Sequence, residues 1–141
     1  MILLDTNVIS EVMRPKTDTQ VMQWLDAQNP ELLYLCSPVL SELLLGIKFL
    51  PNGKRKDSLK TVLDFVRSKI SNTVLSFDAQ TAQVYAALVA HAQSTGYSVS
   101  VGDGQIAAIA KQQGYIVASR DTAPYAAMGL AYIDPWQKTQ T

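Results

Sequence analysis

The chain contains very few of the residues that build disulfide frameworks or zinc sites. Its 141 residues include one cysteine, Cys36, and one histidine, His91. A single cysteine excludes a disulfide within the chain. No basic segment precedes a long apolar stretch, and no apolar run is long enough to span a membrane. We therefore expect a cytoplasmic protein without membrane contact.

Charge of either sign is also scarce. The 12 basic and 12 acidic residues cancel, so the composition does not mark the whole chain as a nucleic-acid or membrane-surface binder. The basic residues are nevertheless concentrated between positions 48 and 69: Lys48, Lys54, Arg55, Lys56, Lys60, Arg67 and Lys69. Two interpretations stay open for this segment, a solvated helix preceded by a lysine-rich loop or a basic face that contacts a ligand.

Apolar sequence is abundant, at 48% of residues, and is sufficient for one compact domain spanning residues 1–141. Buried strands are expected at 2–4, 32–36, 73–77 and 115–119, with a fifth candidate at 130–134. Helices are expected at 8–13, 19–28, 38–50, 57–70, 78–96 and 103–114. Strands that alternate with helices predict an α/β fold whose mostly parallel sheet is covered on both faces.

Small polar residues mark the start of several of these helices. Asp18, Ser37 and Asp78 each precede an apolar periodic segment and are expected to cap it. Pro38 then falls at the first helical position, where its missing N–H costs nothing. The segment 51–56, "PNGKRK", is expected to be a loop within the domain.

Four acidic residues occupy positions that such a fold would bring together. Asp5 and Asp121 follow the first and fourth strands, Glu42 lies in an apolar helix and Asp103 begins another helix. The carboxyl ends of parallel strands meet at one edge of the sheet. Clustered anions repel one another unless a cation neutralises them, and oxygen ligands favour a hard ion. The arrangement predicts a Mg²⁺ or Mn²⁺ site.

Each of these residues also has an ordinary structural interpretation. Glu42 could lie on an exposed stripe of its helix. Asp103 could cap a helix between Gly102 and Gly104, and Asp121 could be a turn residue in "SRDT". The coincidence of all four at strand ends and on facing helices favours the metal site.

Four stretches of the chain resemble the motifs of a known family. They are "LLDTNVISE" at the start, "SELLLGI" in the third helix, "VGDGQIAAIA" before the last long helix and "VASRDTAPYAAMGLAYIDPW" near the end. Their order and spacing resemble a PIN domain of the short bacterial type found as the VapC toxin of type II VapBC toxin–antitoxin modules, with FitB-like relatives.

The resemblance implies a three-layer α/β/α sandwich with metal-dependent endoribonuclease activity. It implies that Asp5, Glu42, Asp103 and Asp121 form the catalytic site and hold Mg²⁺ or Mn²⁺. The position of Asp121 is often Asn or Asp in the family. It further implies that Thr6, Asn7 and Ser119 orient Asp5 or a metal-bound water.

The same resemblance implies partners. We expect an RNA substrate, a cognate VapB-like antitoxin, a homodimer, and DNA contact only through the antitoxin. The antitoxin or a second subunit is expected on the helices at 19–28 and 38–50. The side chains expected to contact the RNA backbone are Lys48, Lys54, Arg55, Lys56 and Arg120.

Two other functional classes are compatible with parts of the sequence. A receiver domain has a similar length and an acidic metal pocket, but it needs paired acids after the first strand and a lysine after the last, and Asp78 would be its phosphoacceptor. A PIN fold that only binds RNA is the other alternative, and the complete acidic set argues against it. Substitution of Asp5 discriminates between binding and catalysis.

Other residues of the sequence give little evidence of a catalytic or binding role. A Cys36–His91 nucleophile pair and a zinc site at His91 are improbable, because Cys36 ends an apolar strand and no second zinc ligand has suitable spacing. Trp24 and Trp136 are interpreted as core or interface residues. The glycines at 102 and 104 do not form a phosphate loop, because no Gly-Lys-Ser/Thr follows them.

Overall fold

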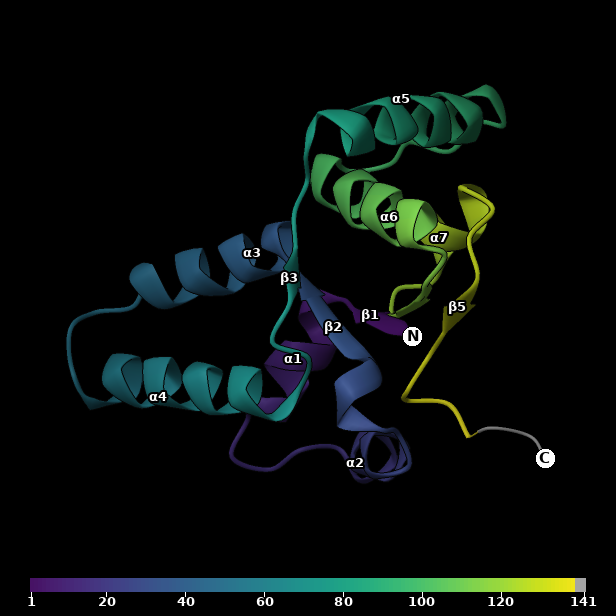
Figure 1. Cartoon of the computed structure of the whole chain (residues 1–141). Coiled ribbons are helices and arrows are strands. Elements are labelled where there is room, and N and C mark those ends of the chain that lie inside the picture. The colour runs from purple at the N-terminus through teal and green to yellow at the C-terminus, as the bar shows by residue number, and fades with distance from the viewer. Residues whose placement is uncertain (139–141) are drawn as a thin grey trace.

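A five-stranded parallel sheet forms the centre of the molecule in the computed structural model, which describes residues 1–138 (Figure 1). The strands are β1 (Ile2–Leu4), β2 (Leu33–Cys36), β3 (Val74–Leu75), β4 (Ile116–Ala118) and β5 (Tyr132–Ile133). The α-helices are α1 (Thr6–Val12), α2 (Thr19–Asp26), α3 (Ser37–Lys48), α4 (Lys54–Lys69), α5 (Ala79–Ser94), α6 (Val101–Gln113) and α7 (Ala123–Ala127), and a 3₁₀ turn, η1, covers Pro30–Leu32.

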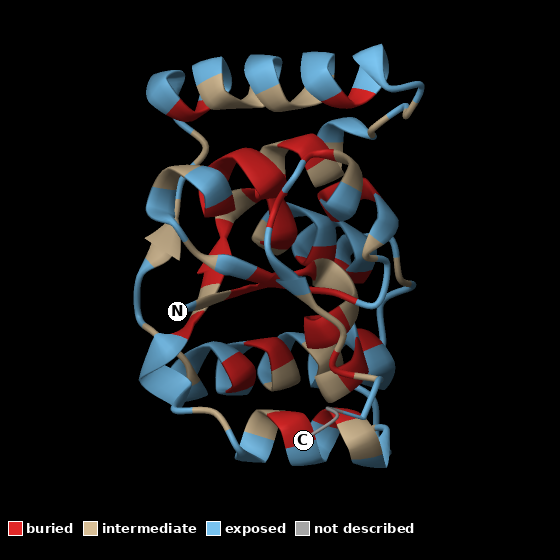
Figure 2. Cartoon of the chain, turned by 90° about the vertical axis from the view of Figure 1, so that its right-hand side faces the viewer, coloured by how far each residue is buried: buried red, intermediate tan, exposed pale blue. Residues whose placement is uncertain are grey.

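Helices cover both faces of this sheet. In Figures 1 and 2, α5 and α6 lie on one side of the strands, and α2 and α4 lie on the other. Figure 2 shows that buried residues concentrate in the strands and on inward-facing helix surfaces. The expected three-layer α/β/α sandwich is confirmed. Within residues 1–138, no helix is both long and apolar enough to cross a membrane.

The strand order β3-β2-β1-β4-β5 places β1 at the centre. The chain moves from β1 outward through β2 to β3, then returns to the other side of β1 to form β4 and β5. A receiver-type sheet has the order 2-1-3-4-5, with β3 in the interior. Here β3 is an edge strand, and Asp78 caps α5 through hydrogen bonds with Thr81, so the receiver interpretation is wrong.

The central strands are short and buried on both faces. Leu3, Leu4, Val117 and Ala118 are each at most 1% exposed, as expected for parallel strands between two helical layers. Leu4 pairs with Ala118, and the Asp5 N–H continues the ladder to the Ala118 carbonyl at 3.0 Å. The residues that follow β1 and β4 therefore emerge next to each other, as predicted.

Helix starts differ from the sequence expectations at three places. Helix α1 begins at Thr6, and Asp5 is its cap. Helix α3 begins at Ser37, so Cys36 occupies its cap position, and the Ser37 hydroxyl accepts a hydrogen bond from the Phe77 N–H (3.3 Å). Helix α6 begins at Val101 and is capped by the Ser100 hydroxyl, so Asp103 lies inside its first turn.

Helix α4 also begins earlier than predicted. Gly53 has φ 153°, which favours glycine, and lets the chain turn into a helix at Lys54. Lys54, Arg55 and Lys56 are thus helical rather than part of a loop. The caps predicted at Asp18 and Asp78 and the fifth strand are confirmed, whereas α7 and η1 were not predicted.

Helices α5 and α6 pack closely against each other because α6 has a glycine at the contact. A Cβ atom on Gly104 would lie 2.6 Å from Cε2 of Tyr85 and 2.9 Å from Cγ2 of Val89. A helix interior normally disfavours glycine by about 0.5 to 1 kcal/mol relative to alanine. The close approach explains why the smallest residue is present here.

We expect Gly104→Ala to lower the free energy of unfolding by about 1 to 3 kcal/mol, because the added methyl group overpacks the α5–α6 contact. The matched control is Gly46→Ala in α3, where a Cβ atom meets nothing within 4 Å. We expect this control to raise stability by about 0.5 to 1 kcal/mol. Urea unfolding of both variants measures the difference, and equal stabilities would contradict this account.

Candidate active site

A cleft of about 590 Å³ opens where β1 and β4 end. In parallel sheets, ligands bind beyond the carboxyl ends of the strands at the point where the chain order reverses, which here lies between β1 and β4. The cleft brings together the four predicted acidic residues and the neighbouring polar side chains. Its lining includes Asp5, Glu42, Asp103, Asp121, Thr6, Asn7, Ser10, Glu11, Arg14, Arg120 and Trp136.

Asp5 is the most buried of the four acids, with 6% of its surface exposed. Its Oδ1 accepts a hydrogen bond from the Thr6 N–H at 2.7 Å. Its Oδ2 accepts two, from the Ser119 hydroxyl at 2.7 Å and from the Tyr125 hydroxyl at 2.9 Å. Three donors hold this carboxylate, and none of them carries a charge.

Asn7 connects α1 to the segment after β4. Its Nδ2 donates to the Ser119 hydroxyl at 3.1 Å, and its Oδ1 accepts from the Arg120 N–H at 3.2 Å. Ser119 is completely buried and also accepts from the Asp121 N–H at 3.1 Å. The three residues expected to support Asp5, namely Thr6, Asn7 and Ser119, thus lie beside it, although only Ser119 contacts it through its own side chain.

Tyr125 was not predicted to belong to the site. It lies in α7, a helix the sequence analysis did not identify, and is completely buried. Burial, with a further contribution from the Asp5 charge, raises the pKa of Tyr125, so its phenol stays protonated and donates. The sequence contains no signal for this contact, because a tyrosine in "APYAAM" is indistinguishable from an ordinary core aromatic residue.

Glu42 reaches the cleft from α3, and glycine makes room for it. A Cβ atom on Gly102 would lie 2.9 Å from Oε1 of Glu42, so the glutamate carboxylate lies against the first turn of α6. Asp103 follows immediately in that turn. The amino end of a helix favours nearby negative charge, which helps to hold the Glu42 carboxylate there.

Asp103 is half-buried beside the other carboxylates. Burial raises its pKa, and the charges of Asp5, Asp121 and Glu42 raise it further against the effect of the Ser100 hydroxyl. We call these four residues the acidic cluster. Of its two members at strand ends, Asp121 is exposed and Asp5 is buried. The Asp121 side chain makes no hydrogen bond within the described residues.

The donor set suits a hydrated Mg²⁺ or Mn²⁺ ion. Within residues 1–138 no three His, Cys, Asp or Glu side chains converge tightly enough to enclose an ion unaided. Mg²⁺ usually takes one or two carboxylates and keeps several waters, so an open cleft lined with carboxylate oxygens fits it. Thr6 Oγ1 is buried without a partner among the described residues and offers a hydrogen bond to such a water.

The five residues predicted to contact RNA lie in different surroundings. Arg120 lines the cleft, with its guanidinium 5.2 Å from the centre of the Trp136 ring, and Arg55 lines an adjoining groove. Lys48 and Lys54 are exposed but line neither. Lys56 requires a correction, because it is 9% exposed and its ammonium donates to the Lys48 carbonyl and to Asn52 Oδ1, which ties α3 to α4.

Arg14 is a cation that the sequence analysis missed. It lines both the cleft and the groove, and its Nη1 donates to Oε2 of Glu11 at 3.2 Å. Glu11 is buried and also accepts from the Asp18 N–H at 2.9 Å. This contact holds the guanidinium end of Arg14 beside Glu11, another residue that lines the cleft.

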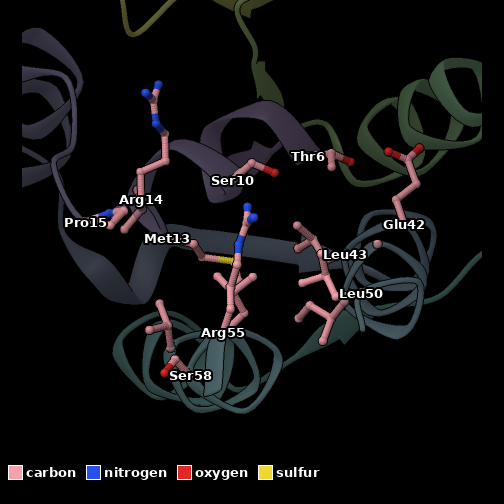
Figure 3. Close-up of a pocket in the computed structure, with 15 residues that line it drawn as sticks. Thr6, Ser10, Met13, Arg14, Pro15, Glu42, Leu43, Leu50, Arg55 and Ser58 are labelled. Atoms are coloured by element: carbon pink, nitrogen blue, oxygen red, sulfur yellow. The ribbon is translucent and has the colours of Figure 1, made fainter. Parts of the chain in front are cut away.

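The adjoining groove is apolar and has a volume of about 670 Å³. It runs between α1, α3 and α4, and Figure 3 shows Glu42 and Thr6 at one end and Arg55 extending from α4. Its apolar lining consists of Val12, Met13, Leu43, Ile47, Leu50, Leu59 and Val62. Thr6, Ser10, Arg14 and Glu42 line both cavities, which are therefore continuous.

Cys36 does not behave as a nucleophile. It is fully buried, and burial raises the pKa of its thiol to about 12, so the reactive thiolate is absent at neutral pH. His91 is exposed on α5 and lines neither cavity. The geometry gives no support to a thiol mechanism.

Comparison with known proteins places the chain in a family. The PIN domain model matches residues 2–129. The chain is 46% identical to the plasmid stability protein StbB of Pseudomonas syringae pv. tomato, with 97% of this chain and 99% of StbB covered. It is 42% identical to the VapC ribonuclease Y4jK of Sinorhizobium fredii, with the same coverage of 97% and 99%.

A solved structure agrees with these relatives. The crystal structure of FitAcB from Neisseria gonorrhoeae superposes with a TM-score of 0.91 at 40% identity, covering 98% of this chain and 100% of the matched one. The resemblance read from the four sequence motifs is thereby confirmed. This chain belongs to the PIN-domain family and, within it, to the group of VapC and FitB-like proteins.

Proposed function

We propose that the protein is a divalent-metal-dependent endoribonuclease that acts as the toxin of a VapBC-type toxin–antitoxin module. The observation that carries this proposal is the convergence of Asp5, Glu42, Asp103 and Asp121 on one cleft. Asp5 also caps α1, but capping needs only one of these acids, and the mutual repulsion of four carboxylates is unfavourable without a cation. The name of the relative Y4jK, a VapC ribonuclease, supports RNA as the substrate.

Asp5, Glu42, Asp103 and Asp121 are the residues that would hold Mg²⁺ or Mn²⁺. A bound ion of this kind supplies Lewis acidity, which polarises the phosphoryl group and lowers the pKa of a coordinated water. The roles of the protein are positioning and charge. Asp5, fixed by three hydrogen bonds, sets the location of the site, whereas the exposed Glu42 and Asp121 can adjust to the substrate.

Cations around the cleft are suited to the RNA backbone. Arg120 and Arg14 line the acidic cleft itself, and Arg55 lines the adjoining groove. Phosphate contacts of this kind position a strand without reading its sequence. We retain Lys48 and Lys54 as contacts outside the cleft and assign Lys56 to the stability of the α3–α4 hairpin.

The apolar groove is our candidate site for the VapB-like antitoxin. It is lined mainly by aliphatic side chains of α1, α3 and α4 and leads directly to Glu42. An apolar peptide segment could fill it and end among the acidic residues, where a basic side chain would be favourable. This position would block substrate access while the toxin and antitoxin are together.

Two further partners follow from the same assignment. We propose a homodimer, for which the exposed Leu44 and Leu45 of α3, together with Phe49 directly after it, provide an apolar contact surface. We propose that DNA is contacted only through the antitoxin, because the toxin chain itself carries no net charge.

We expect Asp5→Asn and Asp103→Asn each to reduce Mn²⁺-dependent cleavage of structured RNA by about 100-fold or more, because each removes a carboxylate that would hold the ion. EDTA should abolish cleavage by the unmodified protein. The matched control is Asp64→Asn, which removes an exposed carboxylate of α4 outside the cleft and should leave the rate unchanged. Gel analysis of labelled RNA gives the rates, with circular dichroism to verify folding.

The outcome of this experiment separates the remaining alternatives. Cleavage that survives both substitutions would place the activity at another site or in a contaminant. RNA binding with no cleavage under any metal, by a folded protein, would support a PIN domain that binds without catalysis.

In the metal-free protein, the contribution of Asp103 to stability should fall as the pH rises. The Asp103 pKa is higher in the folded than in the unfolded state, so between these pKa values the folded state binds more protons and its stability falls with increasing pH. We expect Asp103→Asn to raise the melting temperature in EDTA at neutral pH and to weaken the loss of stability on going from acid to neutral pH. Thermal unfolding across that range tests this, and a variant no more stable than the unmodified protein at neutral pH would contradict it.

The antitoxin assignment is tested at Gly46, which lines the groove and has open space at its Cβ position. A side chain added here therefore begins in open space at the wall of the groove. We expect Gly46→Glu to abolish co-purification with the product of the adjacent reading frame, whereas Gly46→Ala should retain the complex. Failure of the unmodified pair to form a complex would remove the toxin–antitoxin assignment and leave the nuclease assignment intact.

A further inference from the structure

The Asp5 carboxylate is held almost to the limit of what its oxygens can accept. Two hydroxyl groups donate to Oδ2, and one backbone N–H donates to Oδ1. An ionised carboxylate offers about four acceptor positions, two on each oxygen. Only one position, on Oδ1, is therefore left for a ligand in the cleft.

Tyr125 supplies one of the two hydrogen bonds that occupy Oδ2. Without its hydroxyl, Oδ2 would keep one free acceptor position, and the carboxylate could rotate or bind a cation through either oxygen. The phenol is buried and its pKa is raised, so it stays protonated and remains a hydrogen-bond donor to Asp5. Its backbone is fixed as well, because the Leu130 N–H donates to the Tyr125 carbonyl at 3.0 Å.

The chemical nature of the donor is as important as its location. An arginine or lysine beside Asp5 would fix the carboxylate equally well, but its positive charge would oppose the binding of a second cation. Hydroxyl groups provide orientation and leave the negative charge of Asp5 intact. Tyr125 and Ser119 thus satisfy two requirements that a salt bridge could not satisfy together.

We propose that Tyr125 is a positioning residue, which directs Oδ1 of Asp5 into the cleft as the single ligand atom that Asp5 offers to the divalent cation. This inference rests on the proposed function, because it assumes that the acidic cluster binds a metal. It assigns to α7, a five-residue helix distant in sequence from Asp5, a role in the chemistry of the site. A phenylalanine would fill the same space and could not perform this role.

The test is direct measurement of Mn²⁺ affinity, with the free ion followed by electron paramagnetic resonance. The variants are Tyr125→Phe and, as a matched control, Tyr132→Phe, which removes a phenol hydroxyl from an exposed residue of β5 outside the cleft. We expect Tyr125→Phe to raise the Kd for Mn²⁺ about tenfold, the lower end of the effect of removing a group that supports a metal ligand. Tyr132→Phe should leave the Kd unchanged.

Thermal unfolding in EDTA accompanies the titration, because a purely structural role would lower the melting temperature and leave the Kd unmoved. An unchanged Kd in folded Tyr125→Phe overturns the inference. So does an unfolded Tyr125→Phe, since it would assign the hydroxyl to the core. If the unmodified protein neither binds Mn²⁺ nor cleaves RNA, the proposed function fails instead, which is a separate result.

Discussion

A buried anion at the end of the central strand is the constraint on which the rest of this structure depends. Asp5 follows β1 directly and is nearly inaccessible to solvent, so its charge must be satisfied from within the protein. Besides the adjacent Thr6 N–H, the donors are the hydroxyls of Ser119 and Tyr125, which are 114 and 120 positions away in sequence. The sheet order, the position of β4 and the short helix α7 together bring these groups to Asp5.

Repulsion within the acidic cluster destabilises the folded protein, whereas the packing of the helices around it stabilises the folded protein. Burial and, to a smaller extent, repulsion from the other carboxylates raise the pKa of Asp103, and the packing of α6 must offset this cost. The α5–α6 contact at Gly104 and the hydrophobic face of α6 provide that packing. The cleft is therefore kept open by the same helix that its charges destabilise.

The ends of the strands are the most predictable feature. In a run such as "ILLD", the apolar residues predict a buried strand, and the aspartate marks where that strand ends. The alternation of strands and helices then suffices to predict that Asp5 lies beside Asp121. Whether a polar atom bonds to a distant residue could not be predicted. Ser37 was expected to cap α3 but accepts from Phe77, and Lys56 was expected on RNA but holds the α3–α4 turn. Tyr125 shows the same limit, since its hydroxyl has meaning only once β1 and α7 are adjacent.

The long separation in sequence between Asp5 and its hydroxyl donors also determines when the site can form as the chain is synthesised. A ribosome releases the amino-terminal strand first, while Ser119 and Tyr125 are still to be added, and β1 cannot pair with β4 until that strand has left the exit tunnel. Until then Asp5 is an isolated carboxylate on a solvated chain, with no cleft around it. The four-acid cleft is consequently absent from the nascent polypeptide, and it becomes complete only when nearly the whole chain has emerged.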